Sequence, residues 1–149
     1  MLTTDINVEW TVPYDDASTC LVTAHAPIDA YNVLKVFFDP VPGQDSMVII
    51  AFDIINSDAA HTDVSPFEFT NVIFKTVEKY LLNVNPCRKI IFPCSTSSRY
   101  KLLKRLSDPD KIVTGYQLGP DDLVDSNLKS RLINPHYQII SWIKPNDNN

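Results

Sequence analysis

Glycine is scarce in this chain. Its 149 residues include only Gly43, Gly115 and Gly119, and none lies between residues 44 and 114. Glycine lets backbone N–H groups approach a phosphate closely, and the Walker and Rossmann phosphate loops depend on it. The segments 57–65 and 94–98, where such a loop would connect a strand to a helix, contain no glycine. The sequence therefore excludes both types of nucleotide-binding loop.

Cysteine is also scarce, and long apolar runs are absent. Cys20, Cys87 and Cys94 are an odd number with no CxxC spacing, which predicts a reducing compartment and no disulfide scaffold. No apolar run approaches the roughly 20 residues that a membrane helix needs. The start "MLTTDINVEW" has neither the basic nor the apolar region of a secretory signal. We expect a cytoplasmic protein without membrane contact.

Metal-binding and triad motifs are incomplete. His61 and Asp63 in "HTD" are residue types that bind metals, but no neighbouring residue completes a ligand set. We therefore predict a solvated loop and no metal. The chain also contains His25 and His136, but no nucleophile-elbow motif accompanies any histidine, so spacing neither supports nor excludes a Ser-His-Asp triad.

Positive charge is unevenly distributed. The net charge is −5, and no lysine or arginine precedes Lys35. The acidic total argues against nucleic-acid binding over the whole surface. A local basic segment can bind an acidic partner, although a solvated helix face explains the same residues. Seven of the 13 basic residues fall within residues 88–111: Arg88, Lys89, Arg99, Lys101, Lys104, Arg105 and Lys111.

The first half of the chain has the pattern of strands. Apolar and polar residues alternate over 7–13 and 19–26, which predicts a hairpin, and two further strands are expected over 30–40 and 46–55. The last of these is almost unbroken in apolar residues, which is typical of a central strand covered on both faces. Short connections between the four strands favour an antiparallel meander.

A helical period begins after residue 64. Ser65, Pro66 and Glu68 form a capping-box signature, and Asn85–Pro86 ends the helix. The apolar residues that recur at helical spacing should face the sheet: Phe69, Ile73, Val77, Tyr80 and Val84.

The second half alternates between strands and helices. We predict a buried strand over 88–94, a helix over 95–106, a strand over 111–118, a helical segment after Pro120 and a last strand over 136–145. Together with the meander, these elements predict an α+β fold with helices packed on a mixed, mostly antiparallel sheet. The length and a hydrophobic content of 44% predict a single domain over 1–149, with residues 145–149 frayed.

Cys94 and Arg99 share the outline of the cysteine-phosphatase loop, whose pattern is Cys-x5-Arg. That spacing lets N–H groups wrap the phosphate while the arginine binds two of its oxygens. Here only four residues separate Cys94 from Arg99, and none of them is glycine. The loop is therefore too short for that chemistry. The hydroxyl residues 95–98 can still bind an anion together with Arg99, although N-capping of the helix is the more common explanation.

The order of meander, helix, strand and helix resembles the core of GNAT-type N-acetyltransferases. The segments "SMVIIAFDII", "SPFEFTNVIFKTVEKYLL", "KIIFPC" and "SSRYKLLKRL" follow that order over about residues 46–106. The resemblance implies an acetyltransferase-like sheet in which the strands before and after the long helix splay apart. It also implies an acyl-CoA cofactor between these two strands, near Phe52, Asp53, Ile54, Phe92, Pro93 and Cys94.

The departures from that family fall on its chemistry. The pyrophosphate loop, Q/R-x-x-G-x-G/A, would lie in "NSDAAHTDVS", which contains neither glycine nor arginine. The tyrosine that often serves as general acid on the second helix aligns with Leu103. The remaining candidates for an acyltransferase are Asp53 and His61 as bases and Tyr100 as an acid. Both Asp53 and Tyr100 also have a non-catalytic explanation: Asp53 as an acidic residue at the edge or surface of the sheet, and Tyr100 as an amphipathic residue at the rim of the core.

A second resemblance is to small uncharacterised proteins of tailed bacteriophages. The segments that carry it are "YNV", "IIAF", "KTVEKY", "IIF" and "SSRYKLL". It implies a phage accessory protein in the host cytoplasm, and it implies no particular activity.

Two functions of different classes follow from these observations. The first is a non-catalytic interaction protein, without a cofactor, that engages a host protein or another acidic partner; nucleic acid is the less favoured partner. Its binding residues would be Arg99, Lys101, Lys104, Arg105 and Arg88. The alternative is a divergent acyl-CoA-dependent N-acyltransferase, which the missing glycines disfavour. A structural role through a self-pairing sheet edge near the N-terminus is a third hypothesis.

Overall fold

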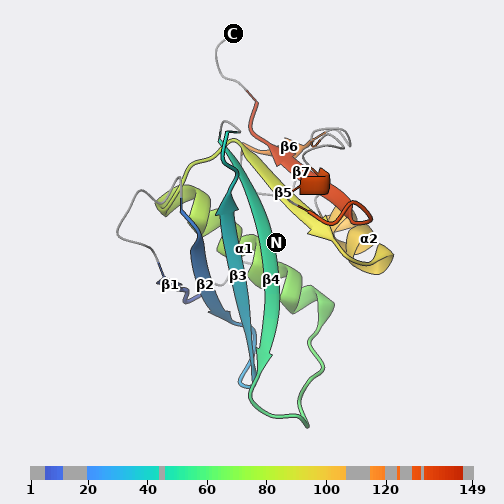
Figure 1. Ribbon diagram of the computed structural model, residues 1–149. Coiled ribbons are helices and arrows are strands. Elements are labelled where there is room, and N and C mark those ends of the chain that lie inside the picture. The colour runs from blue at the N-terminus through green and yellow to red at the C-terminus, as the bar shows by residue number, and fades with distance from the viewer. Residues whose placement is uncertain are drawn as a thin grey trace.

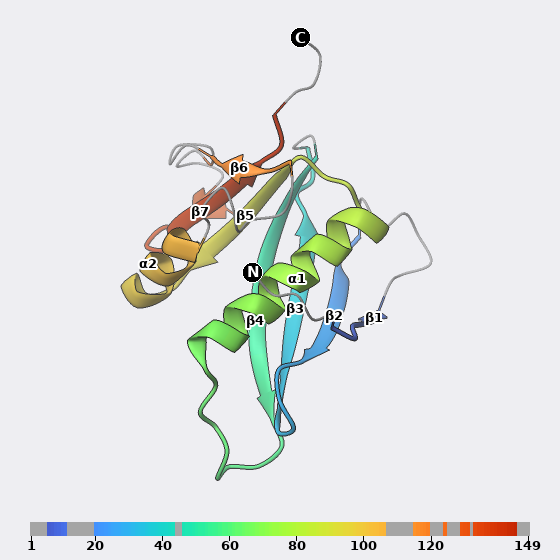
Figure 2. The ribbon, with the colours of Figure 1, turned by 180° about the vertical axis from the view of Figure 1, so that it is seen from behind.

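The computed structural model describes residues 6–11, 20–43, 46–106, 115–119, 124, 129–131 and 133–145. These residues form one seven-stranded sheet with two helices, α1 and α2, on the same face (Figures 1 and 2). The strand order is β1-β2-β3-β4-β5-β7-β6, and every neighbouring pair except β4 and β5 is antiparallel. The predicted α+β class, with a mixed and mostly antiparallel sheet, is confirmed.

The first four strands form the predicted antiparallel meander. They are β1 (Glu9–Thr11), β2 (Val22–Pro27), β3 (Asn32–Pro40) and β4 (Met47–Asn56). Burial alternates along β2 and β3, because one side of each strand packs beneath α1 and the other side has less cover. Val36 pairs with Phe52, so the even-numbered residues of β4 lie on the same face of the sheet as those of β3. The prediction for residues 12 and 13 lies outside the described residues.

Strand β4 is covered on both faces only in its first half, so its predicted burial is wrong for the second half. Met47, Val48 and Ile50 are buried, whereas Ile54 is 43% exposed and Ile55 is 47% exposed. The physical reason is the neighbouring strand. Pairing with β5 stops after Ile49, so within the described part of the chain the rest of β4 lacks the cover that a central strand normally receives.

Helix α1 (Pro66–Asn83) begins where the capping signature places it. The Ser65 hydroxyl accepts a hydrogen bond from the Glu68 N–H, and Pro66 lies in the first turn. Val84 is the C-cap, in agreement with the predicted end of the helix. All five residues predicted to face the sheet belong to the core, with Phe69 and Val84 half-buried and Ile73, Val77 and Tyr80 buried.

The remaining elements are β5 (Lys89–Cys94), α2 (Ser97–Leu106), β6 (Gln117–Leu118) and β7 (Gln138–Ile143). The last strand in the sequence, β7, lies between β5 and β6 and is therefore an interior strand of the sheet. Most of the strand predicted over 111–118 and of the helical segment predicted after residue 120 lies outside the described residues.

The main core lies between the sheet and the two helices. Phe38 stacks on Tyr80 with ring centroids 4.0 Å apart. Trp142 contacts Phe74 and Phe92, with centroid distances of 4.8 and 4.7 Å. These rings join the meander and helix α1 to the C-terminal strands. A smaller cluster on the opposite face of the sheet contains Val41, Met47, Ile91 and Val124.

The side-chain amide of Asn85 is buried and donates to the Tyr80 hydroxyl at 3.1 Å. We predict that Tyr80→Phe lowers the free energy of unfolding by about 1–3 kcal/mol, because this amide would lose its acceptor. Urea denaturation measures this change. Tyr31→Phe is the matched control, since Tyr31 is exposed and its hydroxyl makes no hydrogen bond with a described residue; a change below about 0.5 kcal/mol is expected. Equal losses in the two variants would contradict the prediction.

Candidate functional site

Strands β4 and β5 lie side by side only at one end. Their parallel pairing joins residues 47–49 to residues 89–91, and β4 then continues to Asn56. Strand β5 instead remains paired with β7 along its whole length, from Lys89 to Cys94. The two strands therefore diverge and leave a gap between them (Figure 1).

The pairing ends because β5 has no donor for the next hydrogen bond. The Lys144 N–H donates to the Arg88 C=O at 2.8 Å, so the even-numbered residues of β5 bond to β7 and the odd-numbered residues face β4. The odd-numbered residue after Ile91 is Pro93, which has no N–H. No amide of Pro93 can therefore extend the ladder to β4.

The register of β3 and β4 shows which backbone groups point into the gap. The Ser57 N–H donates to the Tyr31 C=O at 2.9 Å, so the odd-numbered residues of β4 bond to β3. Phe52 and Ile54 therefore direct their N–H and C=O groups toward the gap. Among the described residues, no strand pairs with this edge of β4 beyond Ile49.

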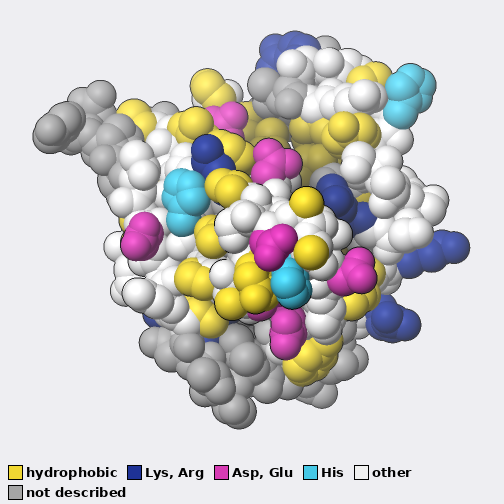
Figure 3. All heavy atoms as spheres, turned by 90° about the horizontal axis from the view of Figure 1, so that it is seen from below, with side chains coloured by type: hydrophobic (Ala, Val, Ile, Leu, Met, Phe, Trp, Pro, Cys, Tyr) yellow, Lys and Arg dark blue, Asp and Glu magenta, His cyan; other side chains and the backbone are white. Residues whose placement is uncertain are grey.

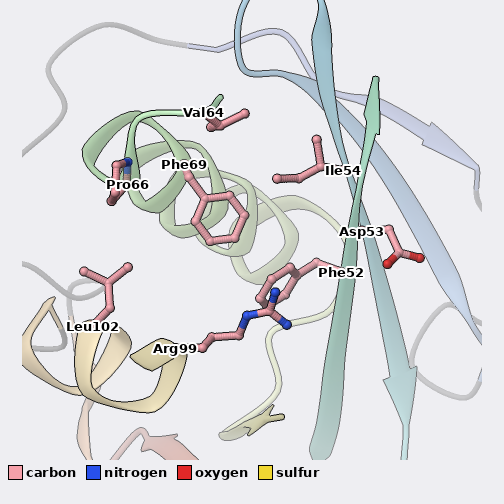
Figure 4. Close-up of a pocket in the computed structure, with 8 residues that line it drawn as sticks. All are labelled: Phe52, Asp53, Ile54, Val64, Pro66, Phe69, Arg99 and Leu102. Carbon is pink, nitrogen blue, oxygen red and sulfur yellow. The ribbon is translucent and has the colours of Figure 1, made fainter. Parts of the chain in front are cut away.

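Two cavities adjoin at the gap, one on each face of the sheet. The cavity on the opposite face from the helices has a volume of about 640 Å³, and its lining includes Phe37, Pro93 and Tyr137. Phe52, Asp53 and Arg99 line both cavities. The cavity on the helix side has a volume of about 420 Å³ and is lined by Phe52, Asp53, Ile54, Val64, Pro66, Phe69, Arg99 and Leu102 (Figure 4).

Arg99 reaches into the gap from the first turn of α2. Its guanidinium carbon lies 4.8 Å from the centre of the Phe52 ring, which is a cation–π contact (Figure 4). Its Nη1 donates to the Ser95 hydroxyl at 3.5 Å. Its backbone N–H donates to Thr96 Oγ1 at 3.1 Å, so Thr96 caps the helix. No carboxylate among the described residues forms an ion pair with Arg99. The guanidinium is thus positioned at the gap without being neutralised.

Phe69 supports the Arg99 contact from helix α1. Its ring lies 5.2 Å from that of Phe52, so an aromatic pair connects α1, β4 and the arginine of α2. The sequence resemblance places Pro93 beside the splayed strands, but it predicts Phe69 only as a core residue and does not show that Phe69 borders an opening. Pro93 within an apolar strand was a further signal of where the strands separate, because proline removes one hydrogen bond from a ladder.

Cys94 ends β5 close to Arg99, but its thiol is buried and only 2% exposed. Burial raises the pKa of the Cys94 thiol to about 11, and the Arg99 charge opposes this only in part. The thiol donates to the Phe92 C=O at 3.6 Å. Since a thiolate is the nucleophilic form of cysteine, this group is unsuited to phosphatase chemistry at neutral pH.

The residues considered as a general base and a general acid do not converge. Asp53 is exposed and borders both cavities, but its side chain points away from Phe52 (Figure 4). Tyr100 lines a different cavity, and its hydroxyl accepts a hydrogen bond from Lys104 Nζ at 3.2 Å. The structure therefore separates the proposed acid Tyr100 from the proposed base Asp53.

His61 belongs to a polar cluster in the loop between β4 and α1. Its ring stacks on Tyr31 with centroids 3.9 Å apart, and its Nδ1 lies 3.1 Å from Asp58 Oδ2. Its backbone C=O accepts hydrogen bonds from the side-chain amides of Asn32 and Asn56. These contacts close the loop against the end of the meander, and His61 does not line either cavity at the gap.

The basic side chains of α2 point in two directions. Arg99 faces the gap, whereas Lys101, Lys104 and Arg105 are exposed on the side of the helix away from the buried Leu103. Lys101 and Arg105 form no ion pair with a described carboxylate. Figure 3 shows the molecule from below, with several Asp and Glu side chains over the middle of this face and Lys and Arg side chains toward its right and upper edges and in its upper left.

Arg88 is not part of this basic surface. It precedes β5, at the opposite end of that strand from α2, and its guanidinium donates to the C=O groups of Lys144 and Pro145 at 3.2 and 2.7 Å. These bonds hold Pro145, the first residue of the segment expected to be frayed; residues 146–149 lie outside the described residues.

The described part of the chain contains no group of three His, Cys, Asp or Glu side chains that could hold a metal ion. None of its helices is long and apolar enough to cross a membrane.

The buried thiols predict a loss of stability at alkaline pH. Burial raises the pKa of Cys87 from 9.0 to about 12 and that of Cys94 from 9.0 to about 11. Above pH 9.0 the thiols of the unfolded chain lose protons while those of the folded chain keep them, so the unfolded state is favoured as pH rises. Urea denaturation should show a falling free energy of unfolding from about pH 9 upward.

The control for this prediction is the double variant Cys87→Ala/Cys94→Ala. Between pH 9 and 10 its stability should vary less with pH than that of the natural chain, because the two thiols that lose protons in the unfolded state have been removed. Tyr80, whose pKa burial raises from 10.0 to about 12, contributes to the pH dependence only at higher pH. Identical pH dependence in both proteins would contradict the assignment to the thiols.

Comparisons with protein-family models, with curated proteins and with solved structures find no match to this chain.

Proposed function

We propose that the protein is a non-catalytic accessory protein of the phage type and that it engages an acidic protein partner through α2. The observation that carries the proposal is the Arg99 guanidinium, which stacks on Phe52 beside two cavities and has no described carboxylate partner. A carboxylate that reached Arg99 would gain a charge-assisted hydrogen bond. The proposal includes a cytoplasmic location and requires no cofactor.

The outer cations of α2 support the same partner class. Lys101 and Arg105 are exposed, and neither is neutralised by a described carboxylate. They lie on one short helix of a chain whose net charge is −5. Such an arrangement favours the approach of an acidic surface to this helix and disfavours its approach elsewhere.

A protein partner is favoured over a nucleic acid by the acidic residues near the gap. Asp53 borders both cavities, and Asp39 borders the cavity on the face opposite the helices. A polyphosphate backbone carries a charge at every nucleotide and would be repelled by these groups. A protein can present a carboxylate to Arg99 and uncharged residues to the acidic positions.

We predict that a fluorescein-labelled polyglutamate binds the protein at low ionic strength and that Lys101→Glu/Arg105→Glu weakens this binding by about tenfold or more. Fluorescence anisotropy measures the affinity. Lys75→Glu/Lys79→Glu on α1 is the control with the same change in net charge, and it should weaken binding less. Equal losses in both double variants, or no binding by the natural chain, would overturn the proposal.

A second candidate is an acyl-CoA-dependent N-acyltransferase, and the divergence of β4 and β5 favours it. An acyl-pantetheine chain would lie in this gap, between Phe52 and Pro93, as the sequence resemblance implies. The first turn of α1 disfavours it. Pro66 has no N–H, and the N–H groups of Glu68 and Phe69 already donate to Ser65. A pyrophosphate would therefore find few donors and the Glu68 carboxylate nearby.

Calorimetric titration with acetyl-CoA tests the second candidate. Saturable binding near micromolar affinity, about −8 kcal/mol, would support it, and Phe52→Ala should then weaken binding by about tenfold while Lys101→Ala leaves it unchanged. The first-turn geometry of α1 leads us to expect no heat at high micromolar cofactor. That result would count against an acetyl-CoA enzyme.

A further inference from the structure

We propose that the gap between β4 and β5 receives an extended peptide segment of the partner protein, which adds to β4 as a strand and places an acidic side chain on Arg99. This proposal rests on the proposed function, since it assigns the acidic partner a chemical form and a position. It goes beyond that function because binding to the outer face of α2 alone would not require the gap.

The edge of β4 supplies the backbone contacts. Phe52 and Ile54 direct N–H and C=O groups into the gap, and no described strand pairs with them. An open edge of this kind is normally blunted by lysine, proline or a bulge. Residues 50–56 contain no lysine and no proline, and their register with β3 is uninterrupted. A peptide strand would satisfy these groups in the same way that β5 satisfies the first residues of β4.

The two cavities supply places for alternate side chains of the peptide. Successive side chains of a strand point to opposite faces. One set would enter the helix-side cavity, against Phe52, Phe69 and Leu102, and the other set would enter the opposite cavity, near Pro93 and Tyr137. A ligand that needed only one face would leave one cavity unfilled, whereas an extended peptide uses both.

Charge determines which face carries the acidic residue. The Arg99 guanidinium lies over the Phe52 ring, and Phe52 belongs to the side of β4 that faces the helices. Asp53 points to the other side (Figure 4). A peptide carboxylate is therefore attracted on the helix side and repelled on the opposite side, which predicts acidic residues at positions of one parity only.

The first test selects ligands from a displayed random-peptide library against the natural chain, with counter-selection against Arg99→Glu. We expect enriched peptides that alternate apolar residues with an acidic residue at a fixed spacing. Their binding should fall by about tenfold or more in Arg99→Glu and remain within about twofold in Lys75→Glu, which makes the same change of charge on α1 and lines neither cavity. No enrichment, or equal binding to Arg99→Glu, would overturn the proposal.

The second test distinguishes an added strand from simple charge attraction. An enriched peptide is synthesised with N-methyl groups on its odd-numbered or on its even-numbered amides. In an added strand, only one of these sets donates to β4, so one N-methylated peptide should lose about tenfold or more in affinity and the other should lose far less. Equal effects of the two sets would overturn strand addition.

The two proposals fail in different ways. Polyglutamate binding that depends on Lys101 and Arg105, together with equal effects of N-methylation at odd and even amides, would support the proposed function and contradict strand addition. If the natural chain bound neither polyglutamate nor any selected peptide, both proposals would be contradicted. Enrichment of no peptide together with saturable binding of acetyl-CoA would assign the gap to the thioester cofactor and contradict the peptide.

Discussion

The missing amide hydrogen of Pro93 determines where strands β4 and β5 separate. Each pair of parallel strands is held by donors and acceptors at alternate residues, and Pro93 removes a donor on the side facing β4. Beyond that point β5 follows β7, while β4 follows β3. The cavities on both faces, the exposed half of β4 and the position of α2 beside the gap all depend on this divergence.

The electrostatics of the gap depend on an aromatic pair as much as on charge. An arginine on an acidic protein is readily neutralised by a neighbouring carboxylate, but Arg99 lies over Phe52, which Phe69 supports from α1. The ring face attracts the cation without cancelling its charge. Asp53, a carboxylate that borders both cavities, is held on the other side of β4 by strand alternation. Backbone geometry therefore keeps the two charges apart.

Periodicity and capping predicted most elements because these signals are local. Ser65 and Pro66 located the start of α1, and alternating polarity located β2 and β3. Cover on both faces of β4 was predicted incorrectly, since it depends on how far a strand distant in sequence remains paired. The same limit applies to the site. The sequence identified Arg99, but it also grouped Arg88 with the helix, and only the fold shows that these arginines lie at opposite ends of β5.

The insertion of β7 between β5 and β6 has a consequence for how the chain folds during synthesis. Strands β2, β3 and β4 and helix α1 contact one another within residues 22–83, so their share of the core needs no residue synthesised later. Strand β5 has no such local partner on its far edge, because Ile90 and Phe92 pair with Trp142 and Ile140 near the C-terminus. A nascent chain that ended before these residues would therefore leave the apolar edge of β5 unpaired, the kind of exposed strand that chaperones bind.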